Sequence, residues 1–302
     1  MYDCSRSEVI IEEKNGDPKE LSFISPLRTG VREIDSATAF FYPFEETLTG
    51  ASSTAVIFLH GLGDRNFNHY KYYAQGLNEA GFSVIFPVLP YFYHRRSAEK
   101  PHGNTFLSGS SDVIEKKFEH AVTDVRCLID FCKKKGFQRI HCMGISFGGM
   151  IACLSMAQDP RIDRGIFVVT GGNFEHITWN SIATKVFRVR YEEDGSCSPE
   201  RCRSLHTDFS ASIMKLRNPA DLESFPSCFR YDPSFFAGLI NRDRVMMFTA
   251  KMDPFIPRRS SDDLWARLGK PKRIFLPAGH ITSHLFFKRK ILSKSILFFQ
   301  NP

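Results

Sequence analysis

Several kinds of segment are missing from this sequence, and each absence narrows what the chain can be. No apolar run approaches the length of a membrane span, which takes about 20 residues. The first six residues are polar and no apolar stretch follows them, so we expect no secretory leader and favour a cytoplasmic protein. The Lys and Arg residues are scattered, and no nucleic-acid-binding motif accompanies them. We therefore interpret the net charge of +7 as a basic surface in contact with water, without a nucleic-acid partner.

The composition is that of a globular chain. Its 302 residues, 42% hydrophobic and 24% charged, are enough to bury a large core in one α/β domain spanning 1–302. Phe is abundant, with 29 residues, which predicts an interior or a pocket rich in aromatic surface. The N-terminal runs at 8–13 and 37–43 are typical of strands at the edge of a larger sheet.

The cysteines do not indicate a disulfide framework or a metal site. Several lie inside predicted helices and strands, as free buried thiols do. Cys197, Cys202 and His206 are close in sequence, but their spacing is not a usual zinc pattern, so we expect no metal. The eight are Cys4, Cys127, Cys132, Cys142, Cys153, Cys197, Cys202 and Cys228.

A G-x-S-x-G pattern from Gly144 to Gly148 is the most informative motif. It follows a short apolar run at 140–143, typical of a buried strand, and precedes a small, apolar run at 150–157 of helical character. Strand, tight turn and helix in this order can expose Ser146 as a nucleophile at the tip of the turn. The glycines lack a Cβ and let strand and helix approach each other closely. The alternative is a small-residue turn that happens to contain a serine.

A second glycine turn follows the continuous apolar run at 54–59, which predicts a central strand buried on both faces. The turn reads His60-Gly61-Leu62-Gly63. We expect its backbone to aim the N–H of Leu62 above the nucleophile, with the N–H of Phe147 as the second donor of an oxyanion hole. Without Ser146 this turn would be interpreted as an ordinary end of a strand.

Strands and helices alternate between and after these motifs, which predicts parallel βαβ units. The expected elements are helices at 66–80 and 112–135 and strands at 82–86 and 165–170. The loop at 87–111 contains His94, Arg95 and Arg96, which could contact a polar part of a substrate. Such clusters are more often surface features, and we favour that interpretation.

The alternation breaks at 174–240, where no clear strand is visible. A loop that long is unusual in a compact domain, so we predict a helical insertion that forms a cap over the site. Its aromatic residues could line an apolar pocket, although we expect most of them to pack the cap onto the core. They are Phe174, Trp179, Phe187, Phe209, Phe225, Phe229, Tyr231, Phe235 and Phe236.

The remaining chemistry-bearing residues follow two more predicted strands, at 244–250 and 272–276. Asp253 lies just past the first strand, and His280 lies on the loop after the second. The chain order Ser146, Asp253, His280, each after a separate strand, matches a Ser-His-Asp triad. His284 is a rival base, but it lies a turn into the helix predicted at 282–300, so we prefer His280.

With these motifs the chain resembles the α/β-hydrolase superfamily, of the serine esterase or lipase type, over residues 50–302. The residues that carry the resemblance are His60-Gly61-Leu62-Gly63, Gly144-Ile145-Ser146-Phe147-Gly148, Asp253 and Ala278-Gly279-His280. It implies a mostly parallel, eight-stranded sheet flanked by helices, with a cap insertion. Most such proteins hydrolyse carboxylic esters, and thioesterases, acyltransferases and peptidases are also represented.

We therefore expect a carboxylesterase or lipase that acts on a small-molecule ester with an apolar acyl group. His280 would take the proton of Ser146, Asp253 would orient the imidazole, and an acyl-enzyme would form and be hydrolysed. No metal or organic cofactor is needed. Two alternatives stay open: acyl transfer or thioester cleavage by the same triad, and a non-catalytic binding protein of this fold.

Overall fold

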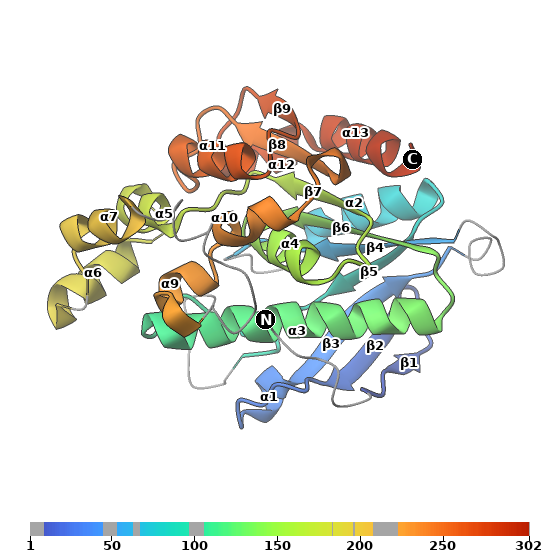
Figure 1. Cartoon of the computed structure of the whole chain (residues 1–302). Coiled ribbons are helices and arrows are strands. Elements are labelled where there is room, and N and C mark those ends of the chain that lie inside the picture. Colours follow the sequence, from blue (N-terminus) through green and yellow to red (C-terminus); the bar gives the residue numbers. More distant parts are fainter. Residues whose placement is uncertain are drawn as a thin grey trace.

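The computed structural model describes residues 9–44, 53–62, 67–96, 106–182, 184–195, 197–207 and 223–301. A single twisted sheet crosses the molecule, and helices cover both of its faces (Figure 1). The strand order is β1-β2-β3-β5-β4-β6-β7-β8-β9. The strands are β1 (Glu12–Lys14), β2 (Lys19–Ile24), β3 (Ser36–Tyr42), β4 (Thr54–Leu59), β5 (Ser83–Pro87), β6 (Arg139–Ile145), β7 (Arg164–Val168), β8 (Val245–Ala250) and β9 (Lys272–Leu276).

The predicted fold class is confirmed, because all pairings from β5 to β9 are parallel. The antiparallel strands β1, β2 and β3 extend the sheet at one edge. The described part of the sheet has nine strands, so the count of eight was wrong. β2 is hard to predict from the sequence because only its alternate residues Leu21 and Phe23 are buried, whereas Lys19, Glu20 and Ser22 are polar.

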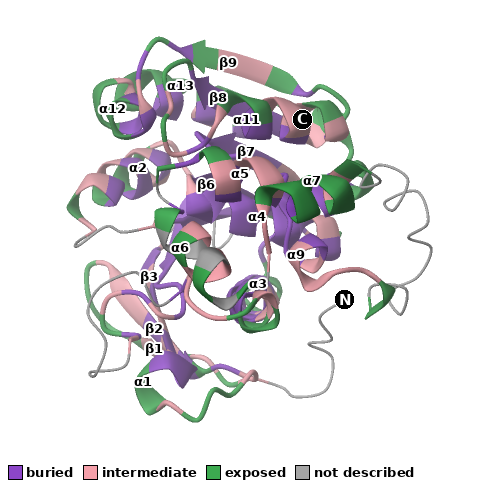
Figure 2. Ribbon diagram, turned by 90° about the vertical axis from the view of Figure 1, so that its left-hand side faces the viewer, coloured by how far each residue is buried: buried purple, intermediate pink, exposed green. Residues whose placement is uncertain are grey.

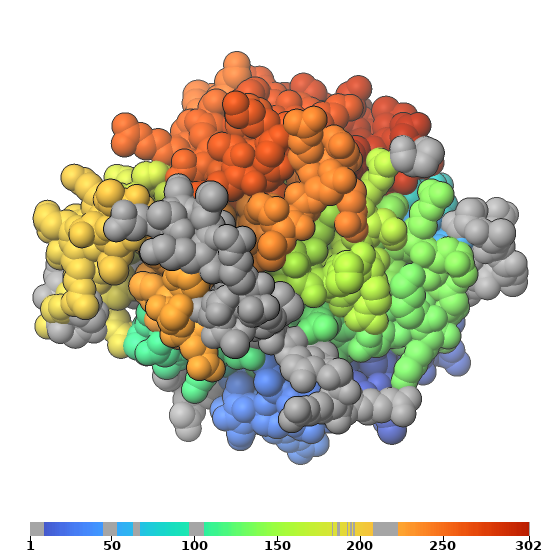
Figure 3. Space-filling view, in the orientation of Figure 1, coloured from blue at the N-terminus to red at the C-terminus, as the bar shows by residue number. Residues whose placement is uncertain are grey.

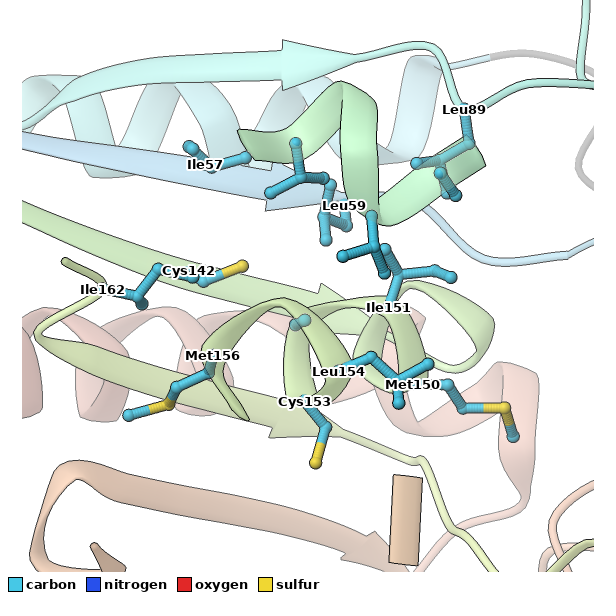
Figure 4. Packing of buried hydrophobic residues seen from close by; sticks show 14 of the residues in the cluster. Ile57, Leu59, Leu89, Cys142, Met150, Ile151, Cys153, Leu154, Met156 and Ile162 are labelled. Carbon is cyan, nitrogen blue, oxygen red and sulfur yellow. The ribbon is translucent and has the colours of Figure 1, made fainter. Parts of the chain in front are cut away.

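The two faces of the sheet carry separate hydrophobic layers, because successive side chains of a strand point to opposite faces. On one face Val56 and Phe58 pack with residues of α2 (Asn68–Glu79) and α13 (Lys288–Gln300). On the other face Ala55, Ile57 and Leu59 pack with residues of three helices. These are α3 (Ser111–Lys134), α4 (Phe147–Gln158) and α11 (Arg258–Arg267). Figure 4 shows the packing of the second layer around Ile57, Leu59 and Ile151.

The last part of the chain forms two helices where one was predicted. α12 (His280–Phe286) and α13 are separated at Phe287. α12 begins at His280 itself, with Gly279 as its N-cap, so the placement of His280 on a loop was wrong. No helix in the described part of the chain is long and apolar enough to cross a membrane.

The described residues of the segment between β7 and β8 form short helices joined by turns, with no strand among them. Its elements are α5 (Phe174–Asn180), α6 (Lys185–Asp194), α7 (Pro199–Thr207), α9 (Ser227–Arg230), α10 (Pro233–Phe236), η3 (Ala237–Leu239) and η4 (Arg242–Arg244). Helices α5 to α7 extend from one side of the molecule (Figures 1 and 3). Phe229, Tyr231, Phe235 and Phe236 are buried in the main hydrophobic layer. Phe209 and the Phe187 side chain lie outside the described residues, and the cap at 174–240 stays a prediction.

Asp232 connects the beginning of the segment between β7 and β8 to a part close to its end. Its carboxylate is fully buried and accepts hydrogen bonds from the backbone N–H groups of Asn173 and Phe174, at 2.8 and 2.6 Å. The N–H of Ser234 donates to the same carboxylate at 2.8 Å. Burial raises the pKa of Asp232, and these three donors act in the opposite direction by stabilising the ionised form. The start of the segment and a part close to its end are thus fixed to one another by one side chain.

Arg95 is neither a surface feature nor a ligand-facing residue, so the interpretation of its loop was wrong for this residue. Its side chain is 1% exposed and forms an ion pair of 2.8 Å with Asp124 on α3. The guanidinium also donates to the carbonyl oxygens of Ile34 and Val88. The neighbouring His94 contacts Thr38, with 2.7 Å between Nε2 and Oγ1. This part of the loop is tied to the first strands and to α3.

We predict that Arg95→Met lowers the free energy of unfolding by about 3 to 5 kcal/mol, because it leaves the charge of Asp124 buried without its partner. Urea denaturation followed by circular dichroism measures the loss. Arg95→Met/Asp124→Leu should recover part of it, and Arg28→Met, at an exposed position, should change little. Equal stability of the Arg95→Met and wild-type proteins would contradict a structural role for this ion pair.

Candidate active site

Ser146 occupies a strained backbone conformation at the end of β6. Its φ and ψ are 56° and −118°, and the next residue, Phe147, begins α4. A non-glycine residue with positive φ is unfavourable and persists only where the surroundings enforce it. Here the N–H of Ser146 donates to the carbonyl of Val168 on β7 at 2.8 Å. The strand, the turn and the helix therefore expose the serine side chain at the carboxyl edge of the sheet.

Two glycines make this turn possible, since neither position has room for a side chain. A Cβ on Gly144 would lie 2.1 Å from the carbonyl oxygen of Gly148. A Cβ on Gly148 would lie 2.3 Å from the carbonyl oxygen of Leu59 and 2.5 Å from that of His60. All these neighbours are backbone atoms. The G-x-S-x-G pattern thus brings α4 against β6 and against the end of β4.

The structure brings the side chains of Ser146, His280 and Asp253 together in one chain of hydrogen bonds. Nε2 of His280 lies 2.7 Å from Oγ of Ser146, and Nδ1 lies 2.7 Å from Oδ2 of Asp253. An ionised carboxylate only accepts, so the imidazole proton is on Nδ1 and Nε2 accepts from the serine hydroxyl. The imidazole and the carboxylate are both largely buried, with 8% and 5% of each side chain exposed.

The carboxylate of Asp253 is fixed by its own loop. Its second oxygen, Oδ1, accepts hydrogen bonds from the N–H groups of Phe255 and Ile256, at 2.9 and 2.8 Å. Because these donors occupy Oδ1, Oδ2 is left to face His280. The aromatic ring of Phe255 also lies against the imidazole, with 5.2 Å between ring centroids.

The loops that carry Asp253 and His280 are tied to one another. They follow neighbouring parallel strands, in which Ala250 on β8 is opposite Leu276 on β9. Past the strands, the N–H of Met252 donates to the carbonyl of Ala278 at 3.1 Å. His284 lies on the next turn of α12 and lines the same pocket, while His280 is within hydrogen-bonding distance of both Ser146 and Asp253.

The turn after β4 lies beside Ser146 because Leu59 is opposite Gly144 in the sheet. His60 is completely buried there, and its Nε2 accepts a hydrogen bond from the N–H of Leu89 at 3.1 Å. The ring proton is therefore on Nδ1, which donates to the carbonyl of Gly61 at 2.9 Å. The neutral imidazole of His60 thus fixes the direction of the Gly61 carbonyl through these two hydrogen bonds.

The direction of this carbonyl fixes the next N–H group as well. In a trans peptide the C=O and the following N–H point to opposite sides, so the N–H of Leu62 points away from His60. Gly61 and Leu62 both line the pocket that contains Ser146. Phe147 is in the first turn of α4, where N–H groups have no acceptor within the helix. Gly63 lies outside the described residues, and the oxyanion hole stays a prediction.

A cavity of about 500 Å³ opens above Ser146. Lys, Arg, Asp and Glu are absent from its lining among the described residues. Most of the lining is apolar, with a few hydroxyl and imidazole groups. The residues are Gly61, Leu62, His69, Tyr70, Leu107, Phe118, Ile145, Ser146, Phe147, Met150, Phe174, Ile177, Ser181, Thr184, Phe255, Ile256, His280, Ile281, His284 and Leu285.

Two residues of the lining were not found from the sequence. His69 and Tyr70 come from α2, and the Tyr70 hydroxyl accepts a hydrogen bond of 2.7 Å from the N–H of Gly61. The only sequence signal was their closeness to the turn after β4. Phe174, one of the aromatic residues expected to be able to line a pocket, does so together with Ile177, and both come from α5. The segment between β7 and β8 therefore supplies part of the cavity wall. In the described part of the chain, no three His, Cys, Asp or Glu side chains lie close enough together to hold a metal ion.

This sheet and the turn that carries Ser146 at its carboxyl edge agree with the α/β-hydrolase fold. Residues 54–194 match the family model described as the alpha/beta hydrolase fold. The resemblance to that superfamily is confirmed, and the chain has the α/β-hydrolase fold.

Solved structures agree on the fold. An esterase from Pyrococcus furiosus has a TM-score of 0.53 at 14% identity, with 97% of this chain and 92% of that chain covered. Acetyl xylan esterase 1 from Thermoanaerobacterium sp. JW/SL YS485 has a TM-score of 0.57 at 18% identity, over 97% and 88% of the two chains. The enol-lactonase from Burkholderia xenovorans LB400 has a TM-score of 0.55 at 14% identity, over 88% and 97%. At these identities the likeness shows the fold alone.

A curated relative shares a shorter stretch. The uncharacterized protein YdjC of Bacillus subtilis (strain 168) is 35% identical over 68 residues. That alignment spans 22% of this chain and 57% of the relative's length.

The neutral state of His60 predicts a pH dependence of stability. Burial lowers the pKa of His60 to about 4, whereas an unfolded chain has the ordinary value of about 6.5. Between these values the unfolded state binds more protons, so the free energy of unfolding falls as the pH falls. This contribution, on the order of 3 kcal/mol, is complete above about pH 6.5 and is lost by about pH 4.

Urea denaturation in steps from neutral pH to about pH 4 measures the effect, and His60→Gln should flatten the profile. Burial also lowers the pKa of His141 to about 4. Replacement of either histidine alone should therefore remove part of the slope of the free energy of unfolding against pH. A wild-type profile that stays flat over this range would show that His60 is not held neutral.

Proposed function

We propose that this chain is a serine hydrolase that cleaves carboxylic esters through Ser146, His280 and Asp253. The observation that supports the proposal best is the hydrogen-bonded series of these three side chains at the floor of an apolar cavity. Ser146 has the required exposure and strain, and the oriented imidazole has a free electron pair directed at its hydroxyl. The esterases among the structural neighbours agree with this reaction class.

In the first half-reaction Oγ of Ser146 attacks the acyl carbonyl carbon, and Nε2 of His280 takes the hydroxyl proton. The imidazolium that forms is stabilised by Asp253, whose Oδ2 already accepts from Nδ1. The negative charge on the carbonyl oxygen is stabilised by the N–H groups of Leu62 and Phe147. The direction imposed on the first by His60 means that this donor is oriented before substrate binds.

The tetrahedral intermediate then collapses and the ester C–O bond breaks. His280 gives its proton to the departing alcohol oxygen, which leaves an acyl group on Ser146. Water enters and loses a proton to the same nitrogen as its oxygen attacks the acyl carbon. Return of the proton to Ser146 releases the carboxylic acid and regenerates the site.

The lining of the cavity favours an uncharged substrate of moderate size. A charged group would lose its hydration there without meeting an opposite charge among the described lining residues. Apolar acyl chains instead gain free energy by leaving water, at about 0.8 kcal/mol for each buried CH₂ group. We therefore assign the cavity to the acyl part of an apolar ester.

We predict that Ser146→Ala reduces kcat on p-nitrophenyl esters by roughly five to six orders of magnitude, because the nucleophile is removed. The same change should abolish covalent labelling by a fluorophosphonate. A matched control is Ser155→Ala, at a buried serine on the same helix that does not line the cavity, and it should retain activity and labelling.

Three results would contradict parts of this proposal. Full activity of Ser146→Ala would exclude Ser146 as nucleophile. A wild-type protein that neither hydrolyses an ester nor reacts with the probe would exclude the enzyme. Labelling without hydrolysis, accompanied by acylation of an added alcohol or thiol, would replace hydrolysis by acyl transfer.

A second prediction concerns acyl length. Ile177→Trp should fill part of the cavity and shift the preferred p-nitrophenyl ester to shorter acyl chains, with the loss largest for the longest chain. The comparison of kcat/KM across an acyl series measures the shift. Val189→Trp is the control, because Val189 is exposed on α6 and outside the cavity lining. An unchanged length preference in Ile177→Trp would show that the acyl group binds elsewhere.

A further inference from the structure

Helix α12 is amphipathic in the opposite sense to a usual surface helix. Its inward residues, His280, Ser283 and His284, are polar and buried. Among its outward residues, Ile281 and Leu285 are exposed, and Phe286 is 79% exposed. His280 and His284 face the candidate active site, whereas nothing in the described part of the chain covers Phe286 or the exposed parts of Ile281 and Leu285. Contiguous exposed apolar residues on a folded protein mark an interaction surface.

Two further segments near α12 and the cavity carry exposed apolar residues. Ile281 and Leu285 line the cavity themselves. Met252 is 65% exposed and its N–H donates to Ala278, two residues before α12 begins. Ile182 is 58% exposed and its N–H donates to the carbonyl of Pro254, in the same loop as Met252. We call Ile182, Met252, Ile281, Leu285 and Phe286 the apolar rim.

A cluster of positive charge borders the rim. Lys288, Arg289 and Lys290 are all exposed and form the first turn of α13, directly after α12. Cations are unfavourable at a helix N-terminus, because the positive end of the helix dipole is there. Helix stability therefore does not account for three of them in this turn. Nζ of Lys288 lies over the ring of Tyr72 on α2, 4.4 Å from its centre, so this charge is held beside α2.

The surrounding sequence adds no negative charge. After Asp263 the chain contains no Asp or Glu. Over the same stretch it contains Arg267, Lys270, Lys272, Arg273, Lys288, Arg289, Lys290 and Lys294. Figure 2 shows α12 at the upper left beside α13, with its outer side coloured as exposed.

We propose that the apolar rim and the basic turn 288–290 dock this protein on an anionic lipid bilayer, with the mouth of the cavity toward the lipid. Apolar side chains would enter the interface, and the three cations would bind lipid head groups beside them. Such docking gives an apolar ester a path into the cavity that avoids water. The docking surface lies outside the triad, so its test does not depend on the proposed ester hydrolysis.

Charge favours a bilayer over a second copy of this chain. A symmetric contact through the apolar rim would place the basic turns of both copies at one interface, with no acidic residue of the same stretch to offset them. Like charges facing one another oppose association. An anionic bilayer instead supplies the opposite charge together with an apolar interior.

The test is co-sedimentation of the whole protein with lipid vesicles, in two compositions. We expect binding to phosphatidylcholine vesicles in which about a third of the lipid is phosphatidylglycerol, and weak binding to phosphatidylcholine alone. Lys288→Gln/Arg289→Gln/Lys290→Gln should weaken the anionic binding roughly a hundredfold. Phe286→Ser should weaken binding to the same vesicles, and about 1 M salt should suppress the charge-dependent part.

Controls separate docking from folding and from chemistry. Arg28→Gln/Arg32→Gln/Lys134→Gln removes the same charge at exposed positions near α1 and at the end of α3, at the opposite side of the sheet from α12 (Figure 1), and should bind as wild type. Ser146→Ala should also bind as wild type, whatever its activity. Far-UV circular dichroism of Phe286→Ser and of the basic-turn variant should match wild type.

Three outcomes would overturn the proposal. The first is no binding to either kind of vesicle by the wild-type protein. The second is equal loss of binding in the basic-turn variant and in its charge-matched control, which would indicate net charge alone. The third is a wild-type protein that does not bind vesicles and is a dimer in sedimentation velocity, while Phe286→Ser is a monomer. That result would assign the apolar rim to a second copy of the chain.

Discussion

The candidate site depends on one close approach between backbone segments at the carboxyl ends of β4 and β6. The carbonyls of Leu59 and His60 come so near to Gly148, and that of Gly148 so near to Gly144, that no side chain fits between them. This contact forces Ser146 into its positive-φ conformation and sets the turn after β4 beside it. The strain of the serine is small compared with the buried packing of two central strands and α4, which is why the conformation persists.

Two further side chains of the candidate site, Asp253 and His60, come from other loops, and each is oriented by hydrogen bonds to the backbone. Asp253 is fixed by two N–H groups of its own loop, and His60 by the N–H of Leu89. Both side chains then act on a neighbour, Asp253 on the imidazole of His280 and His60 on the peptide that precedes Leu62. Because these orientations exist without a ligand, the proposed reaction requires little movement of either side chain.

Some parts of the structure can be predicted from the sequence because the residue types there fit only one kind of local structure. Gly144, Gly148 and the apolar runs of β4 and β8 are enough by themselves to predict a tight turn and buried strands. Other features depend on partners distant in the chain. Arg95 resembles a surface residue because nothing local shows that it pairs with Asp124, and β2 is hidden because only alternate residues face the core. His69 and Tyr70 reach the cavity only through the packing of α2.

The three hydrogen bonds of Asp232 have a consequence for how the chain tolerates changes in length. Because they join residues 173–174 to residues 232–234, the chain between them is a closed loop whose ends are already together. The entropy of closing such a loop grows only slowly with its length, by about 0.6 kcal/mol for each doubling. A change of length at exposed positions of the loop therefore costs little free energy. The buried residues Phe174, Phe229 and Tyr231 still have to pack against the rest of the core. The exposed part of this loop can therefore change in length, and the wall of the cavity with it, while the sheet and the Ser146 turn stay as they are.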